Sequence, residues 1–316
     1  MSKVYFDVRS ELIQMRTLVN ALVRKRSRSA ITCSAYLEIL RNWISLVTVT
    51  DLSTKLEIAE IQRIMADLGT HTVVFQLLAN GLVVQEERSP IGLLVAKEPT
   101  KLRMFEDSLA FLKLLCHENA NVQDRFVEHS RLLFGLVEVD GLSASDLLSA
   151  IAINNENIIS NHGEEWIRFY FHEINTFGPV SASWLRILGT LVKCNGKAKR
   201  DNQVLVMNLL QKSNVSSSTF VESEEGWDER IKLMQGGLGG DTNKLVFHLE
   251  AVKLLTICSE GKNPASEVYA ASHISFQTVM RTLISLNVDS KGKKWDIPMS
   301  VAVQMRQTYV AFLHQV

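Results

Sequence analysis

The sequence predicts an all-α protein, specifically an armadillo-like α-solenoid of stacked antiparallel helices. Three observations support this fold class. Apolar residues recur at spacings of three and four along most of the 316 residues, which is the period of one face of a helix. Alternating strand-like patterns are scarce, and the best of them, at residues 47–50, continues a helical run. A pattern of helix, polar turn and helix also recurs, as in proteins that stack helical repeats.

The individual helices follow from this period and from their start signals. An amphipathic run extends from Leu56 to Leu68, is interrupted at Gly69 and resumes at Val73. Residues 143–146 precede a further run with the spacing of a capping box. The other helices are predicted at residues 109–116, 122–134, 147–153, 166–177, 184–194, 204–210, 245–258, 276–286 and 301–313. We expect roughly 13–15 helices of ordinary length, most of them joined by short loops.

An internal repeat is visible in three leucine-rich runs that each end in a cysteine and a polar turn. The runs end at Cys116, Cys194 and Cys258, and each is followed by a new amphipathic run. The cysteines lie about 78 and about 64 residues apart, and each interval is interpreted as roughly two short helical-repeat units. Each helix pair would bury its apolar face on its neighbours.

Two long polar stretches indicate the domain organisation. Residues 85–101 contain two prolines, and residues 213–241 contain a serine run and five glycines. The second stretch is the better boundary. We therefore predict an N-terminal helical segment at 1–59, a main helical domain at 60–212, a Ser/Gly-rich connector at 213–243 and a C-terminal helical block at 244–316 that continues the solenoid.

Charge, hydropathy and cysteine spacing exclude several classes of protein. The 34 Lys and Arg balance 34 Asp and Glu, so the excess of positive charge that non-specific nucleic-acid binding requires is missing. No apolar run approaches the ~20 residues of a membrane-spanning helix, and the N-terminus lacks the apolar core of a secretion signal. We expect the isolated chain to be soluble. The four cysteines lack the paired spacing of zinc ligands, which favours buried, reduced thiols in a reducing compartment.

Three groups of residues have some character of a chemical site. The glycine tract 235–244 has no strand before it and does not end in Gly-Lys-Ser/Thr, so a connector is favoured over a phosphate-binding loop. The oxygen-rich residues 138–146 lack the residue order of a calcium loop and favour a turn before a capped helix. Scattered histidines and carboxylates lack the second matched set of a di-metal bundle. They are His117, Glu118, His129, His162, Glu164, Glu165, His172 and Glu173.

No catalytic, cofactor-binding, metal or ligand residue is therefore assigned, and nothing in the sequence requires an enzyme. A hydrolase that uses His162, Glu165 and His172 is the weakest alternative. The one dense basic run is Arg24-Lys-Arg-Ser-Arg28, and residues 1–30 hold seven basic residues against two acidic ones. An anionic partner is one interpretation of this run, and a solvated helix end is the more common one.

Five motifs occur in an order that resembles one family. They are residues 63–78, 111–126, 154–157, 187–207 around Lys193-Cys-Asn-Gly-Lys197, and 254–263 around Cys258-Ser-Glu-Gly-Lys-Asn263. The order resembles the ryanodine and inositol-trisphosphate receptor homology (RIH) domain, and the helices after it, of the inositol-trisphosphate receptors, a family of intracellular calcium-release channels. The resemblance covers about residues 60–316, whereas residues 1–55 match little of the family.

Receptors of this family carry two RIH copies, and the chain resembles the second, central copy. The first copy places an Arg-Lys pair before an Asn-Gln at the start of a helix. The stretch Asn119-Ala-Asn-Val-Gln123 has no basic residue at that place. The resemblance therefore transfers no ligand-binding residue to this chain.

The resemblance implies a cytosolic regulatory and coupling segment of an inositol-trisphosphate-gated calcium-release channel, which transmits ligand-driven motion toward the pore. The segment itself would neither bind the ligand nor conduct. Its expected partners are other domains of the same polypeptide, neighbouring subunits of a homotetramer and regulatory proteins, on the cytosolic face of the endoplasmic reticulum or another calcium store. The alternative is a stand-alone helical-repeat scaffold for protein interactions. The uncapped helical pattern at 301–313 favours a fragment of a longer protein.

Overall fold

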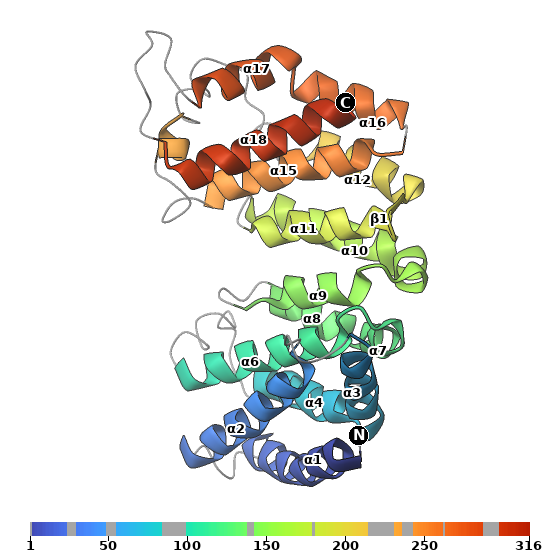
Figure 1. Cartoon of the computed structure of the whole chain (residues 1–316), viewed down its shortest axis with the longest axis vertical. Helices are drawn as coiled ribbons and strands as arrows, with labels where there is room; N and C mark the ends of the chain where they lie inside the picture. The colour runs from blue at the N-terminus through green and yellow to red at the C-terminus, as the bar shows by residue number, and fades with distance from the viewer. Residues whose placement is uncertain are drawn as a thin grey trace. The chain divides into compact units, whose positions relative to one another are not determined.

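The computed structural model confirms the all-α class (Figure 1). It describes residues 2–23, 30–48, 55–83, 99–137, 142–178, 181–213, 231–235, 243–261, 263–286 and 297–316, which are helical apart from short turns and one two-stranded hairpin. The chain divides into two compact units, Met1–Asn155 and Glu156–Val316. Within each unit the helices pack on one another, as an α-solenoid requires.

The first unit is built from three long helices and several shorter ones packed on them. Its elements are α1 (Ser2–Val23), α2 (Ala30–Val47), α3 (Lys55–Leu68), α4 (Thr70–Val83), α6 (Pro99–Cys116), α7 (Ala120–Phe126), the 3-10 turn η1 (Val127–His129), α8 (Ser130–Val137) and α9 (Ala144–Ala152). Trp43 of α2 is fully buried, with its ring 5.4 Å from that of Phe111 in α6. The Tyr36 hydroxyl lies 2.7 Å from Ser108 Oγ, so polar and apolar contacts both join α2 to α6.

The second unit is centred on α15, which packs between α11 and α18 (Figure 1). Its elements are α10 (Glu156–Phe177), α11 (Ala182–Leu191), β1 (Lys193–Cys194), β2 (Lys197–Ala198), α12 (Arg200–Lys212), α15 (Asn243–Ser259), α16 (Pro264–His273), α17 (Phe276–Ser285) and α18 (Met299–Gln315). A buried hydrogen bond of 2.8 Å between His248 Nε2 and the Tyr309 hydroxyl fixes α18 against α15.

Several helix boundaries differ from those predicted. Gly69 does separate two helices, with φ at +82°. The run predicted at residues 122–134 is broken into α7, η1 and α8, and α10 begins at Glu156, well before the predicted start at residue 166. The run predicted at 184–194 ends at Leu191, because residues 193–198 form an antiparallel hairpin.

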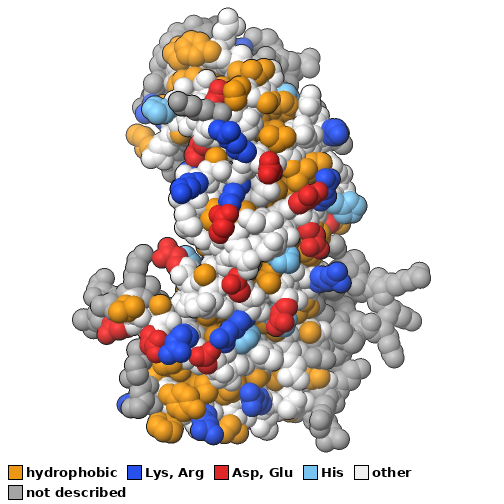
Figure 2. Space-filling model, turned by 90° about the vertical axis from the view of Figure 1, so that its right-hand side faces the viewer, with side chains coloured by type: hydrophobic (Ala, Val, Ile, Leu, Met, Phe, Trp, Pro, Cys, Tyr) orange, Lys and Arg blue, Asp and Glu red, His pale blue; other side chains and the backbone are white. Residues whose placement is uncertain are grey.

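The predicted connector at 213–243 lies mostly outside the described residues, so the four-part division of the chain stays a prediction. All four cysteines are buried and form no disulfide, which agrees with the prediction of buried thiols. Acidic and basic side chains are intermixed on the face shown in Figure 2, in keeping with the balanced composition. No helix among the described residues has the length and apolar character to cross a membrane.

Candidate functional site at the helix corners

Buried glutamines hold the ends of helices at three similar places, which we call corners. A corner consists of the carbonyl end of one helix, the turn after it and the asparagine that precedes the next helix. At the first corner, Gln62 of α3 is 3% exposed, and its Nε2 donates to the carbonyls of Leu114 (2.8 Å) and His117 (3.2 Å) at the end of α6. Its Oε1 accepts from Asn119 Nδ2 at 3.1 Å.

The second corner repeats this arrangement at the end of α9. Gln123 of α7 is 1% exposed, and its Nε2 donates to the carbonyls of Ala150 (2.8 Å) and Ile153 (3.1 Å). Its Oε1 accepts from Asn155 Nδ2 at 3.2 Å. The two carbonyls are again three residues apart, and the asparagine again precedes a helix.

The third corner lies in the second unit at the end of α15. Gln203 of α12 is fully buried, and its Nε2 donates to the carbonyls of Ile257 (3.0 Å) and Glu260 (3.1 Å). Its Oε1 lies 3.4 Å from Asn263 Nδ2, which donates to it. Three glutamines from three different helices therefore make the same set of contacts.

The chemistry of a primary amide explains this choice of residue. A helix leaves its last four carbonyls without partners inside the helix. A glutamine offers two N–H donors for two such carbonyls and one oxygen for the asparagine. Each turn passes through the left-handed region, with φ of +54° at Glu118, +55° at Asn154 and +83° at Gly261. The turn brings both chain segments within reach of one side chain.

A fourth helix end, that of α11, uses an asparagine from the following helix. Asn202 of α12 donates from Nδ2 to the carbonyl of Leu191 at 2.7 Å. The amide lies over Gly163 of α10, where an added Cβ would be only 2.7 Å from Asn202 Nδ2. A side chain at position 163 would therefore displace the amide that closes this helix.

The β1–β2 hairpin and the start of α12 brace the third corner with charged groups. Lys193 Nζ lies 2.5 Å from Glu260 Oε2, and Arg200 donates to the carbonyl of Gly261 at 3.3 Å. Lys199 pairs with Glu156 at the start of α10 and holds the pKa of that carboxyl below its usual value. The hairpin and the residue before α12 thereby connect the beginning of α10 with the end of α15 inside one unit.

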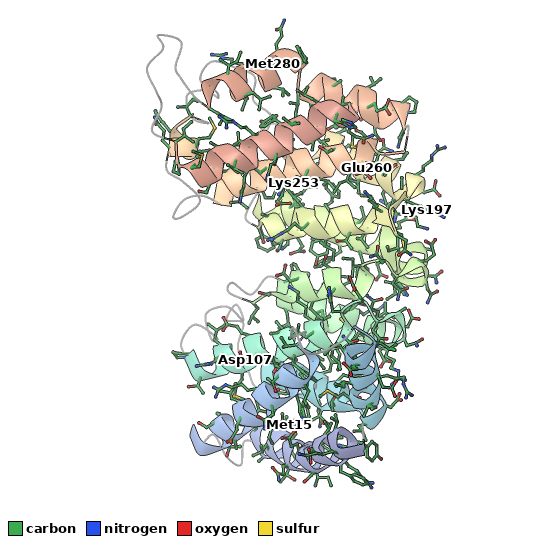
Figure 3. All side chains as sticks on the ribbon, viewed as in Figure 1. Met15, Asp107, Lys197, Lys253, Glu260 and Met280 are labelled. Carbon is green, nitrogen blue, oxygen red and sulfur yellow. The ribbon has the colours of Figure 1, made fainter. Side chains whose placement is uncertain are left out.

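The hairpin also explains a glycine. A Cβ at Gly261 would lie 2.9 Å from Ala198 Cβ, and the residue has positive φ, so both space and backbone conformation require glycine. Figure 3 shows Glu260 and Lys197 near this end of the second unit, where Lys197 is exposed at the hairpin. Two of the sequence motifs, Lys193–Lys197 and Cys258–Asn263, therefore meet in space.

Two histidines of the first unit, the buried His71 and the partly exposed His129, stack on phenylalanine rings. His71 stacks on Phe126 with ring centroids 5.4 Å apart, and His129 stacks on Phe75 at 3.9 Å. Burial, with smaller contributions from the nearby His129 and Arg125, lowers the pKa of His71 to about 4. Burial also lowers the pKa of His129. Both rings therefore act as neutral packing groups near pH 7.

The other polar residues considered from the sequence do not gather into a site. The described residues contain no group of three His, Cys, Asp or Glu that could hold a metal ion. Glu164 pairs with Arg168 at 2.9 Å on α10. α9 begins just after Ser143, as the capping-box spacing predicts, although the Ser143 side chain makes no capping bond. The basic run 24–28 and residues 138–141 and 236–242 lie outside the described residues.

Sequence reasoning missed the three glutamines that form the corners. A usable signal exists, because Gln123 lies four residues after Asn119, which precedes α7, and Gln203 lies four residues after Lys199, which precedes α12. In the sequence, a glutamine at that spacing resembles an ordinary exposed residue in the first turn of a helix. Only the fold shows that it is buried against another helix end.

The fold and the corners define the class of this protein, an all-α protein of stacked helices whose ends are tied by amide side chains. A family model of the RIH domain matches residues 46–219, more than half of the chain. The chain belongs to the RIH-domain family.

A relative extends this result. The chain is 27% identical over 195 residues to the inositol 1,4,5-trisphosphate receptor itr-1 of Caenorhabditis elegans, and the alignment covers 58% of this chain. It covers 7% of that receptor, so the chain spans a small part of the length of this relative. The predicted resemblance to the RIH region of inositol-trisphosphate receptors is confirmed.

Proposed function

We propose that the chain is a cytosolic regulatory and coupling segment of an inositol-trisphosphate-gated calcium-release channel. Membership of the RIH-domain family and similarity to a receptor of that name support this function. The segment acts without enzymatic chemistry and neither binds the ligand nor conducts. It works at the cytosolic face of a calcium-store membrane, against other domains of the same polypeptide and neighbouring subunits.

The repeated corner is the observation that carries the proposal. A coupling segment must pass on a displacement as a shift of whole packed blocks rather than lose it in bending between helices. Directional hydrogen bonds from Gln62, Gln123 and Gln203 tie a helix to the carbonyl end of a later one. Each unit therefore resists relative sliding of its helices.

The direct test changes one corner in the full-length polypeptide that carries this segment. Gln203→Leu removes the donor and keeps most of the volume, and Gln277→Leu on the exposed face of α17 is the matched control. We expect Gln203→Leu to leave inositol-trisphosphate binding intact and to reduce ligand-evoked calcium release. If hydrogen exchange shows that the corner is open in Gln203→Leu and calcium release still equals that of the control, the coupling role is refuted.

Sequencing the transcript on both sides of this reading frame tests the assignment itself. Coding sequence for hydrophobic spans of ~20 residues downstream supports a channel segment. Stop codons on both sides in a full-length message would instead indicate a stand-alone scaffold and overturn the proposal. From the sequence alone we also propose a hinge in the stretch 213–241, whose glycines lie outside the described residues. Gly→Pro changes there that leave gating unaltered would contradict that role.

A further inference from the structure

The first two corners are built on one short helix, α7. This helix packs against α3, α6 and α9 in the first unit (Figure 1). Asn119, the residue before α7, belongs to the first corner, and Gln123 in the first turn of α7 forms the second. A single helical turn therefore separates a side chain of one corner from a side chain of the next.

Asn119 takes part in the first corner and in the first turn of α7 at the same time. Its Nδ2 donates to Gln62 Oε1 at 3.1 Å and to the carbonyl of Ala59, also on α3, at 3.4 Å. Its own carbonyl accepts from the amides of Val122 at 3.0 Å and Gln123 at 2.9 Å. The Asn119 side chain makes no capping bond to α7, so it serves the first corner alone. A shift of Gln62 therefore acts on the residue that holds the start of α7.

At the second corner, α7 holds the turn after α9 with two neighbouring side chains. Asn155 is 3% exposed, and its Nδ2 donates to Gln123 Oε1 at 3.2 Å and to Asp124 Oδ1 at 3.0 Å. Both acceptors belong to consecutive residues of α7. A movement of the first turn of α7 therefore changes both bonds to Asn155 together.

The third corner has a different residue at the corresponding position. α12 follows Lys199 instead of an asparagine that is bound by an earlier glutamine. The Lys199 ammonium group pairs with Glu156, whose side chain is 62% exposed. Exposed ion pairs contribute little and are screened by salt. The third corner is therefore an internal comparison for the first two.

We propose that the first two corners form one cooperative element, in which opening of the Gln62 corner also opens the Gln123 corner through Asn119. The members of a buried hydrogen-bond network support one another, so the loss of one weakens the rest. This cooperation rests on the proposed coupling role for its biological meaning. It gives the route by which a displacement at α3 reaches the end of α9 within the first unit.

Hydrogen exchange in the complete chain tests the cooperation directly. The reporters at the second corner are the amides of Ile153 and Asn155, which make backbone hydrogen bonds of 2.9 and 3.1 Å. The amide of Leu109, a buried residue in the middle of α6, reports unfolding of the whole unit. Relative to Leu109, protection at the second corner should fall about tenfold in Gln62→Leu, although Gln62 makes no bond to that corner.

A second variant isolates the proposed link. Asn119→Ala removes the side chain that joins the two corners and leaves the bonds from Gln62 to the end of α6 in place. Alone it should lower protection at the second corner as Gln62→Leu does. Adding Gln62→Leu to it should lower that protection no further, because the link is already broken. Asn119 is only partly buried and makes no capping bond, so this variant should fold even if Gln62→Leu does not.

Two control variants separate cooperation from general loosening. Tyr36→Phe removes the buried hydroxyl that lies 2.7 Å from Ser108 Oγ, which weakens the contact of α2 with α6 and leaves α7 unchanged. Gln203→Leu opens the third corner. Neither should change protection at the second corner relative to Leu109.

Three results would overturn the proposal. The first is exposure of the Asn119 amide, which donates to the Cys116 carbonyl at 3.2 Å, in Gln62→Leu without any change at the second corner. The second is additive losses from Asn119→Ala and Gln62→Leu. The third is an equal relative loss in Tyr36→Phe, which would reflect weakening of the unit as a whole. Calcium release tests the coupling role separately, so either proposal can fail while the other stands.

Discussion

The third corner gives the sharpest prediction about stability. Gln203 is fully buried, and its Nε2 donates to two carbonyls at 3.0 and 3.1 Å. Gln203→Leu keeps a similar volume, so the cost of a new cavity is small. The substitution removes both donors and leaves the carbonyls of Ile257 and Glu260 without this partner.

The size of the effect follows from these contacts. Each of the two short bonds contributes about 1 kcal/mol, and burying groups left without partners adds roughly 1 kcal/mol more. The 3.4 Å contact from Asn263 adds little, because hydrogen bonds weaken at that length. We therefore expect Gln203→Leu to lower the free energy of unfolding of the second unit by about 3 kcal/mol. The urea midpoint should fall by roughly 1.5 M for a unit of this size.

Hydrogen exchange reports the effect at the corner itself, which matters because the two units can unfold in separate steps. Amide protection at the end of α15 and the start of α16 should fall about 100-fold in Gln203→Leu. Gln277→Leu on α17 should change stability by less than about 0.5 kcal/mol. If the two variants have the same protection at this corner, the glutamine does not hold the helix end and the reasoning fails.

Three further predictions concern other residues. Gly261→Ala should cost roughly 2–3 kcal/mol, because it combines positive φ with a contact to Ala198, whereas Gly135→Ala in the open face of α8 should be neutral or stabilising by urea titration. The pKa of His71 is about 4 in the fold and 6.5 in the unfolded chain, so the unfolded state binds the proton first and stability is lost as pH falls through this window. The loss should reach about 2.5 kcal/mol near pH 4.5, and His71→Phe should remove that part of the pH dependence. Burial raises the pKa of Cys258, so its thiol should react with a disulfide reagent only after denaturation, and rapid labelling of the native chain would contradict its burial.

Periodicity was sufficient to predict the fold class, and it failed where apolar residues are sparse. α10 begins at Glu156, but Ile158 and Ile159 are the only aliphatic residues in its first ten positions. Two adjacent apolar residues in an otherwise polar stretch give no clear helical period. The run at 122–134 failed for the opposite reason, because a continuous pattern hides the change of direction through η1.

The turns that form the corners could be predicted from the sequence, but the side chains that contact them could not. The turns after Cys116 and Cys258 were predicted as polar connections between helices, and they are the places where Gln62 and Gln203 bind. The partner of each turn lies more than fifty residues away, on a helix that periodicity alone cannot orient. Each interval between the cysteines was interpreted as roughly two helical-repeat units, and the turn at Asn154 divides the first interval in two. Residues 214–230 and 236–242 of the second interval lie outside the described residues, so its interpretation stays a prediction.

The choice of neutral amides at the corners has a consequence for coupling. Exposed ion pairs such as Arg63–Glu60 weaken as salt rises, because mobile ions screen them. A buried bond from Gln62 or Gln123 to a carbonyl carries no net charge and keeps its direction at any ionic strength. The stiffness of each unit should therefore be insensitive to salt.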